Sequence, residues 1–206
     1  MKIAIVDYGM GNIKSLESIL KHLGAPEVNY TKNPESLFSS DKVILPGVGS
    51  FGEAIDNIEK RGLRAIIEEL AIERKKTFLG ICLGMQIMAN SSEEAPDKKG
   101  LGLIQGNLTR FPHSKLTKVP HVGFNQVEFG NDSTLFKGLS SGCDFYFTHS
   151  FKLTNNSNIQ KGICRYGEEF IAAFEQENLF GTQFHPELSQ QNGLALMDNF
   201  LRAKQC

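Results

Sequence analysis

Three short apolar runs, separated by stretches with apolar residues at helical spacing, place the strongest constraint on the fold. Short apolar runs are typical of buried strands, and apolar positions three and four residues apart indicate helices that cover a sheet. A strand–helix alternation of this kind predicts a parallel sheet with helices on its faces. The strand runs cover residues 3–6, 43–45 and 77–81, and the helical patterns cover residues 13–23, 51–58 and 63–70.

The second half of the chain has a different pattern. It predicts successive strands separated by short polar turns, and then a final helix over residues 193–202. A chain of 206 residues suffices for one substantial core and is short for two, and it shows neither an internal repeat nor a low-complexity linker. We therefore expect one α/β domain over residues 1–206, with a central, mostly parallel sheet flanked by helices and additional antiparallel strands in the second half. The predicted strands of that half are residues 106–111, 124–129, 144–148, 162–166, 170–176 and 179–184.

Composition and charge exclude several classes of function. The net charge is −1 and the basic residues are scattered, so nucleic-acid binding is not expected. The sequence contains no run of 18 apolar residues, so we expect no membrane span. Residues 1–7 resemble a strand more than a signal peptide. The four cysteines, Cys82, Cys143, Cys164 and Cys206, form no C-x-x-C pair. This spacing argues against a disulfide framework and against a metal site. It is typical of reduced thiols in a cytoplasm.

The segment around Cys82 has the form of a nucleophile elbow. Gly80, Ile81, Cys82, Leu83 and Gly84 read G-x-C-x-G and follow a predicted strand. Glycines allow the sharp strand-to-helix turn that such an elbow needs, and the following helix start favours a thiolate. The N–H of Leu83 is then a candidate donor to an oxyanion. The alternative is an inert buried cysteine at the end of a strand.

A second candidate element is the sequence His185, Pro186, Glu187. Residues two apart on an extended chain point to the same side, and Pro186 favours an extended His185. A carboxylate beside an imidazole fixes the tautomer and supports the imidazolium. The alternative is a surface loop, but together with Cys82 the pattern predicts a Cys-His-Glu triad.

The glycine-rich segment of residues 46–52 allows two interpretations. Its glycines permit unusual backbone angles and a close approach to a ligand, as in a strand that presents an N–H to an oxyanion. Gly47, Gly49 and Gly52 also match G-x-G-x-x-G, with Glu73 about 20 residues later, which is typical of dinucleotide binding. Against a dinucleotide, the segment does not follow the first strand, and Glu73 lies in a helical pattern.

Together these elements resemble the class I, or triad, glutamine amidotransferases over nearly the whole chain. A narrower set of motifs is similar to the glutaminase subunits of imidazole glycerol phosphate synthase. These motifs cover residues 7–12, 46–49, 80–86, 92–94, 100–102, 120–123, 146–150, 183–187 and 189–190.

The resemblance implies an activity and a partner. The cysteine would attack the side-chain amide of L-glutamine, and the ammonia would pass to a separate (β/α)₈-barrel synthase subunit without any cofactor. The residues that the resemblance places around glutamine are Gln86, Glu94, the backbone of His149, Ser150 and Phe151, and the oxyanion strand with Gly47, Val48 and Gly49.

Two positions depart from that pattern. Leu188 stands where these subunits usually have lysine, and Phe124 where they usually have tryptophan. Both positions face the partner in the family, so a sister subunit that supplies ammonia for sugar amidation in surface polysaccharide synthesis is a second hypothesis. A nucleotide-binding oxidoreductase and a cysteine peptidase or thiol hydrolase are alternatives of other classes.

Overall fold

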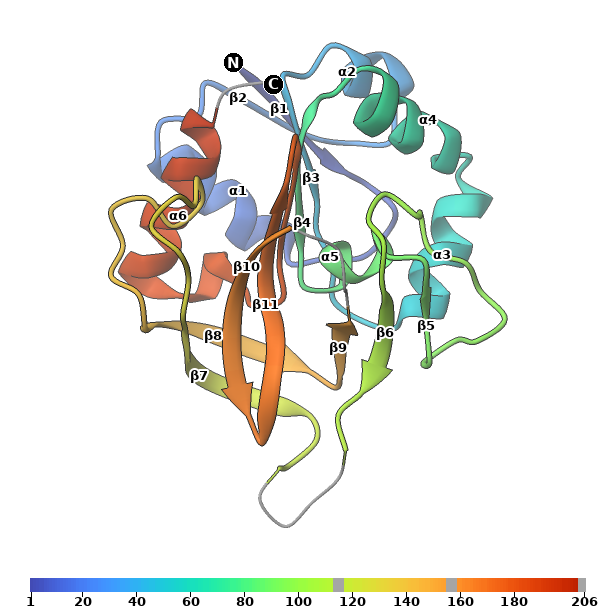
Figure 1. The fold of residues 1–206 in the computed structure, drawn as a ribbon. Coiled ribbons are helices and arrows are strands. Elements are labelled where there is room, and N and C mark those ends of the chain that lie inside the picture. Colours follow the sequence, from blue (N-terminus) through green and yellow to red (C-terminus); the bar gives the residue numbers. More distant parts are fainter. Residues whose placement is uncertain (113–116, 155–158, 204–206) are drawn as a thin grey trace.

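The computed structural model describes residues 1–112, 117–154 and 159–203 (Figure 1). The helical elements are α1 (Ile13–His22), α2 (Pro34–Phe38), α3 (Phe51–Lys60), α4 (Arg64–Glu68), the π-helical turn η1 (Glu69–Glu73), α5 (Leu83–Ile87), the 3₁₀ turn η2 (Pro186–Leu188) and α6 (Gln190–Arg202). The strands are β1 (Lys2–Val6), β2 (Glu27–Thr31), β3 (Lys42–Leu45), β4 (Thr77–Ile81), β5 (Ser91–Ser92), β6 (Asn107–Arg110), β7 (His121–Val127), β8 (Cys143–His149), β9 (Phe151–Thr154), β10 (Gln160–Tyr166), β11 (Glu168–Gln176) and β12 (Leu179–Thr182).

The strands form a large sheet in the order β2-β1-β3-β4-β12-β11-β9-β6-β5, with β10 paired to β11. The strands from β2 to β12 along this order run parallel to one another. Beyond β12, the pairings of β11 with β12, β9 and β10 and of β6 with β9 are antiparallel. A separate antiparallel pair, β7–β8, crosses beside the sheet (Figure 1). The predicted α/β class, parallel first and antiparallel later, is confirmed.

Helices cover both faces of the central parallel strands because β1, β3, β4 and β12 are buried on both sides. In β1, Ile3 and Ile5 belong to one buried cluster, and Ala4 and Val6 belong to the other. This alternation is the period-two geometry of a strand. The first cluster packs against α1 and α6, and the second packs against α3, α4 and α5, on opposite sides of the sheet in Figure 1.

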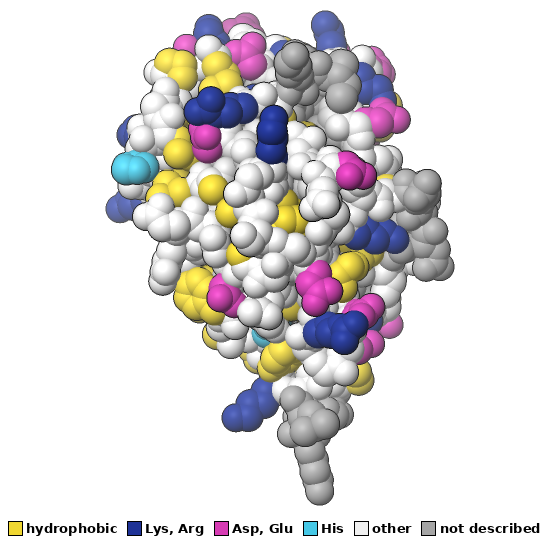
Figure 2. Space-filling view, turned by 60° about the vertical axis from the view of Figure 1, so that its left-hand side comes forward, with side chains coloured by type: hydrophobic (Ala, Val, Ile, Leu, Met, Phe, Trp, Pro, Cys, Tyr) yellow, Lys and Arg dark blue, Asp and Glu magenta, His cyan; other side chains and the backbone are white. Residues whose placement is uncertain are grey.

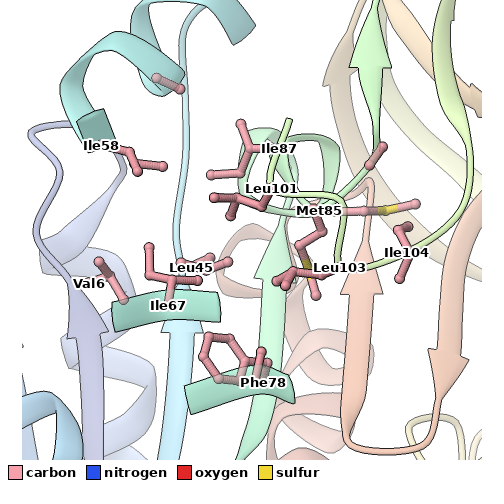
Figure 3. Close-up of a cluster of buried hydrophobic side chains, with 14 of the residues drawn as sticks. Val6, Leu45, Ile58, Ile67, Phe78, Met85, Ile87, Leu101, Leu103 and Ile104 are labelled. Carbon is pink, nitrogen blue, oxygen red and sulfur yellow. The ribbon is translucent and has the colours of Figure 1, made fainter. Parts of the chain in front are cut away.

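The second of these clusters holds the short helix α5 in place (Figure 3). Met85 and Ile87 of α5 are fully buried there, near Leu45 of β3 and Phe78 of β4. Burying each side chain of this size stabilises the fold by about 1.5–3 kcal/mol. The beginning of α5, directly after Cys82, is therefore fixed against the sheet by packing rather than by the helix propensity of five residues.

Several elements differ from the sequence prediction. The structure adds β2, α2, β5 and β9, starts β7 at His121 rather than residue 124, and starts α6 at Gln190 rather than residue 193. The edge strand β2 is polar and largely exposed, so it carries no buried apolar run for periodicity to detect. The helix α2 has only five residues and depends on its cap, in which Ser36 N–H donates to the Asn33 side chain.

Two further expectations concern membranes and cysteines. In the described part of the chain, no helix is both long and apolar enough to cross a membrane. Cys82, Cys143 and Cys164 are free thiols, and Cys206 lies outside the described residues.

Candidate active site

The carboxyl ends of three neighbouring parallel strands carry the candidate elements. Leu45, the last residue of β3, pairs with Gly80 of β4, and Thr182, the last residue of β12, pairs with Ile81. The glycine segment, the elbow and the His-Pro-Glu sequence therefore leave the sheet side by side. Parallel pairing brings together residues that are more than 100 positions apart in sequence.

The elbow at Cys82 has the strained backbone that the sequence predicts. Cys82 has φ 51° and ψ −108°, a conformation that side chains rarely adopt. Its neighbours must be glycine because the turn is closely packed. A Cβ on Gly80 would lie 2.7 Å from the backbone of Met85, and one on Gly84 would collide with the carbonyl of Leu45. The N–H of Leu83 is at the first position of α5, where backbone donors lack intrahelical partners.

The glycine segment after β3 packs directly on this elbow. A Cβ on Gly47 would lie 2.7 Å from the Leu83 side chain and 2.6 Å from the hydroxyl of Tyr8. That hydroxyl, which is fully buried, donates to the carbonyl of Pro46, and burial raises the pKa of Tyr8 far above its usual value. Gly49 has φ 120°, so its backbone requires glycine. The segment is held at its base by Tyr8 and contacts the nucleophile turn.

His185 and Glu187 form a buried pair. The Nδ1 atom of His185 lies 2.8 Å from Oε1 of Glu187, and each side chain is only 2% exposed. The backbone that brings these two side chains together differs in part from the sequence prediction. His185 is extended, with φ −98° and ψ 97°, but Glu187 lies in the 3₁₀ turn η2 and not on a continued strand. The turn brings the carboxylate back to the imidazole.

The second nitrogen of His185 faces the nucleophile. Burial alone would lower the pKa of His185, but Cys82 and Glu187 together outweigh burial and raise this pKa to about 10. Nε2 itself is buried and has no hydrogen-bond partner among the described residues. The imidazole therefore faces the sulfur without forming a hydrogen bond to it. Catalytic pairs in ligand-free sites are often loose in this way. The favoured charge state is an imidazolium beside the sulfur.

A cavity of about 250 Å³ opens over Cys82 and His185. Most residues that the resemblance implies line it, whereas Gly47 lies beneath the elbow and Glu187 stands behind His185. The lining residues are Val48, Gly49, Cys82, Leu83, Gln86, Glu94, Pro120, Thr148, His149, Ser150, Phe151 and His185.

The position of Glu94 bears on whether residues 47–52 bind a dinucleotide. Its Oε2 accepts a hydrogen bond of 2.7 Å from the N–H of Phe51, the first residue of α3. In a dinucleotide site, this helix start would receive a pyrophosphate. Here a carboxylate already occupies the position, and a second anion would be repelled. The geometry therefore disfavours the G-x-G-x-x-G interpretation and leaves Glu94 with one oxygen toward the cavity.

A hydrogen-bonded pair of histidines, His149 and His121, lies at the cavity, and His149 lines it. Nδ1 of His149 lies 2.8 Å from the carbonyl of Phe151, which can only accept, so His149 carries its proton on Nδ1. Its Nε2 must then accept from Nδ1 of His121 at 3.0 Å. Burial lowers the pKa of His121 to about 4 and that of His149 to about 3, which keeps both rings neutral.

Sequence reasoning assigned no role to Pro120, His121 and Gln183, which the structure places at or beside the cavity. All three lie in the motifs that carry the resemblance, which was the available signal. Among the residues that the structure describes, no three His, Cys, Asp or Glu side chains are grouped so that they could hold a metal ion.

The fold and this geometry agree with the comparisons to known proteins. Residues 4–203 match the family model described as glutamine amidotransferase class-I. The chain belongs to the class I glutamine amidotransferase family.

Among named relatives, the imidazole glycerol phosphate synthase subunit HisH of Moorella thermoacetica is 45% identical over 199 residues, which are 96% of this chain and 93% of that protein. The subunit HisH 1 of Campylobacter jejuni is 39% identical over 201 residues, 97% of this chain and 99% of that protein. A crystal structure of a glutamine amidotransferase shares the fold with a TM-score of 0.77 at 18% identity, covering 98% of each chain.

Proposed function

We propose that this chain is the glutaminase subunit of an imidazole glycerol phosphate synthase, acting as one domain over residues 1–206. It hydrolyses L-glutamine to glutamate and ammonia for histidine biosynthesis. The observation that carries this proposal is the arrangement of Cys82, His185 and Glu187. The cysteine stands on a strained elbow, and the imidazole is held on its far side at 2.8 Å by the carboxylate. The near full-length relatives named HisH support the pathway.

The first chemical step forms a thioester. The Cys82 thiolate attacks the carbonyl carbon of the glutamine side-chain amide, and an electron pair moves onto the oxygen. The N–H of Leu83 and one from the glycine segment after β3 stabilise that oxyanion. The His185 imidazolium gives its Nε2 proton to the amide nitrogen, the C–N bond breaks and ammonia leaves. Glu187 keeps the imidazole oriented throughout this transfer.

The second step restores the enzyme. Neutral His185 takes a proton from a water molecule, whose oxygen attacks the thioester carbon. The C–S bond breaks, the electron pair returns to the Cys82 sulfur and glutamate leaves. The site again holds a thiolate beside an imidazolium, and the raised pKa of His185 favours the imidazolium of this pair.

The cavity is suited to the amino-acid end of glutamine. The unshared oxygen of Glu94 offers an acceptor to the α-ammonium group, and Gln86 offers a polar side chain on the same wall. The backbone of His149, Ser150 and Phe151 lines the cavity beside Gln86, whose Nε2 donates to the Phe151 carbonyl at 3.3 Å. The neutral histidine pair fixes the Phe151 carbonyl, so this wall is rigid before glutamine binds.

We also propose where the ammonia-accepting subunit, a (β/α)₈ barrel, docks. Val122, Phe124 and Leu188 are 56%, 50% and 40% exposed, which is unusual for side chains of this size. Phe124 contacts Tyr146 edge to face, and the backbone of Tyr146 is bonded to that of His185. This apolar surface therefore adjoins the triad, where a partner would receive ammonia.

The charges around the surface of Val122, Phe124 and Leu188 do not favour a strongly charged partner such as a nucleic acid. The side with α1, α6 and the β7–β8 pair faces the viewer in Figure 2, where acidic and basic side chains are interspersed among hydrophobic ones. Neither sign forms an extended patch among the coloured residues of that view. The proposed surface is thus suited to a protein partner, and the free thiols are consistent with a cytoplasmic location.

A sister subunit for sugar amidation is the second candidate, because Leu188 departs from the family pattern at this surface. A lysine there would pair with a carboxylate of the partner, whereas Leu188 can make only an apolar contact. An unpaired buried carboxylate in a partner would be costly. The same glutaminase chemistry would serve either acceptor.

Labelling and substitution test the glutaminase chemistry. A glutamine-mimicking electrophile should modify Cys82 and spare Cys143, Cys164 and Cys206, as mass spectrometry would show. Cys82→Ser should abolish glutamine hydrolysis in the complex with the synthase subunit and leave the circular dichroism spectrum unchanged. A label on another cysteine, or an active Cys82→Ser variant, contradicts the triad.

Complementation tests the pathway. The gene should restore histidine-independent growth to a strain that lacks only its glutaminase subunit, in minimal medium with low ammonium. The Cys82→Ser gene is the matched control and should not restore growth. Failure to complement, combined with glutaminase activity on addition of a sugar-modifying partner from the same genome, would favour the sister subunit.

A further inference from the structure

The side chain of Gln183 connects the nucleophile to the glutamine-facing wall. Gln183 follows β12 and is completely buried. Its Nε2 lies 3.6 Å from the sulfur of Cys82, and its Oε1 accepts a hydrogen bond of 3.0 Å from Nε2 of Gln86. The triad mechanism uses no atom of this side chain, although it touches the reacting sulfur.

The direction of these bonds follows from one fixed acceptor. The backbone carbonyl of Phe151 can only accept, and Nε2 of Gln86 donates to it at 3.3 Å. The amide group of Gln86 is thereby oriented, and its second N–H reaches Oε1 of Gln183. With its oxygen engaged by a donor, Gln183 must turn its NH₂ group toward Cys82. The sulfur thus receives a donor from Gln183 at 3.6 Å, and the carbonyl of Thr148, at 3.8 Å, is the acceptor for the proton of the neutral thiol.

We infer that Gln183 donates an N–H hydrogen bond to the Cys82 thiolate, stabilising its charge and aiming the sulfur into the cavity. This inference rests on the proposed function, in which Cys82 is the nucleophile. Cys82 is only 6% exposed, so little water can solvate a charge on its sulfur. A neutral amide supplies a donor that neither titrates nor competes with the histidine for the proton.

The titratable side chains around the sulfur do not supply such a donor. The titratable groups facing it are His185, His149 and Glu94 in the cavity and Tyr8 beneath the elbow, with Glu187 behind His185. The proton of His185 must move during the reaction. His149 and Tyr8 direct their protons to the carbonyls of Phe151 and Pro46, and Glu94 is a carboxylate. Gln183 thus provides a donor that remains in place throughout the reaction.

Two substitutions separate the donor from the rest of the side chain. Gln183→Met keeps a similar length and volume but has no N–H. Gln183→Glu keeps an acceptor for Gln86 and replaces the donor with a carboxylate oxygen. The matched control is Gln176→Glu, the same chemical change at the end of β11. Gln176 pairs with Leu179, which in turn pairs with Phe78, at the end of the sheet opposite Cys82.

The measurement is the pH dependence of Cys82 alkylation by iodoacetamide in the full chain, quantified by mass spectrometry of the Cys82 peptide. Only the thiolate reacts, so the midpoint reports the charged form. Loss of one hydrogen bond to a charged group should raise the midpoint by roughly one pH unit in Gln183→Met. Below the midpoint, alkylation should then be about tenfold slower. Gln183→Glu should shift the midpoint further, because its carboxylate repels the thiolate.

Every outcome of this experiment decides the question. An upward shift in the folded Gln183 variants, with the Gln176→Glu midpoint equal to wild type, supports the inference. An unchanged midpoint in either folded variant, or an equal shift in the control, overturns it. Because alkylation requires no glutamine turnover, the result is independent of the activity assay. An active Cys82→Ser variant would instead show that the proposed function fails.

Discussion

The substitution Glu187→Gln tests the most specific feature of the site, the carboxylate that orients the catalytic imidazole. Oε1 of Glu187 lies 2.8 Å from Nδ1 of His185, and both side chains are 2% exposed, so solvent screens this contact little. Glutamine has nearly the same shape and still offers an oxygen to the Nδ1 proton. The variant therefore removes a charge and retains an acceptor.

The size of the effect follows from the loss of one charge-assisted contact. A hydrogen bond to a charged group contributes about 1.5–3 kcal/mol, which corresponds to a loss of roughly 10- to 150-fold in kcat. The same loss should lower the pKa of His185 from its value of about 10, toward its ordinary range, since only Cys82 then favours the imidazolium. His185→Ala removes the proton carrier itself and should cost more, at or above the ~10²–10⁴-fold typical of a general base.

The assay is steady-state glutaminase activity in the presence of the synthase subunit, with thermal unfolding as a check of the fold. Glu177→Gln is the matched control, because Glu177 forms an exposed ion pair with Lys75 at 2.7 Å, at the opposite end of the sheet. It should leave kcat unchanged. If Glu187→Gln were as inactive as His185→Ala while remaining folded, the carboxylate would have a role beyond orientation and the reasoning would be refuted.

Three further predictions follow from the packing and the charges. His121 and His149 have folded-state pKa values of about 4 and about 3, below the unfolded value, so their contribution to stability is complete above pH ~6.5 and is lost as the pH falls toward 4. Urea unfolding at pH 7 and pH 4.5 should show this loss, and it should persist in a variant of the exposed His22; equal stability at both pH values would contradict it. Gly84→Ala should destabilise the fold by about 1–3 kcal/mol or more through the collision with the β3 carbonyl, whereas Gly130→Ala, which has open space, should change the melting temperature little. The isolated chain should be a poor glutaminase, because we expect the glycine segment after β3 to rest with its oxyanion donor misaligned. Binding of the synthase subunit would select the aligned conformer and activate the chain. Full activity of the chain alone would argue against this.

Local sequence patterns predicted the elements whose signal is short-range. The apolar run of β4, the glycines around Cys82 and the periodic pattern of α1 all express constraints between residues a few positions apart. The polar edge strand β2 and the short helix α2 were missed for the same reason. Their stability comes from pairing with β1 and from a side-chain cap, and neither produces an apolar period.

The candidate site divides in the same way. The sequence by itself determined a cysteine elbow, a His-Pro-Glu element and a glycine segment, because strained turns and paired side chains require particular residue types. Only the tertiary structure decided that Glu94 binds the start of α3, that His121 is hydrogen-bonded to His149, and that Gln183 reaches Cys82. The physical reason is that each of these contacts joins residues between 28 and 101 positions apart. Their partners are set by how strands pair and layers pack, so no local pattern of residues encodes them.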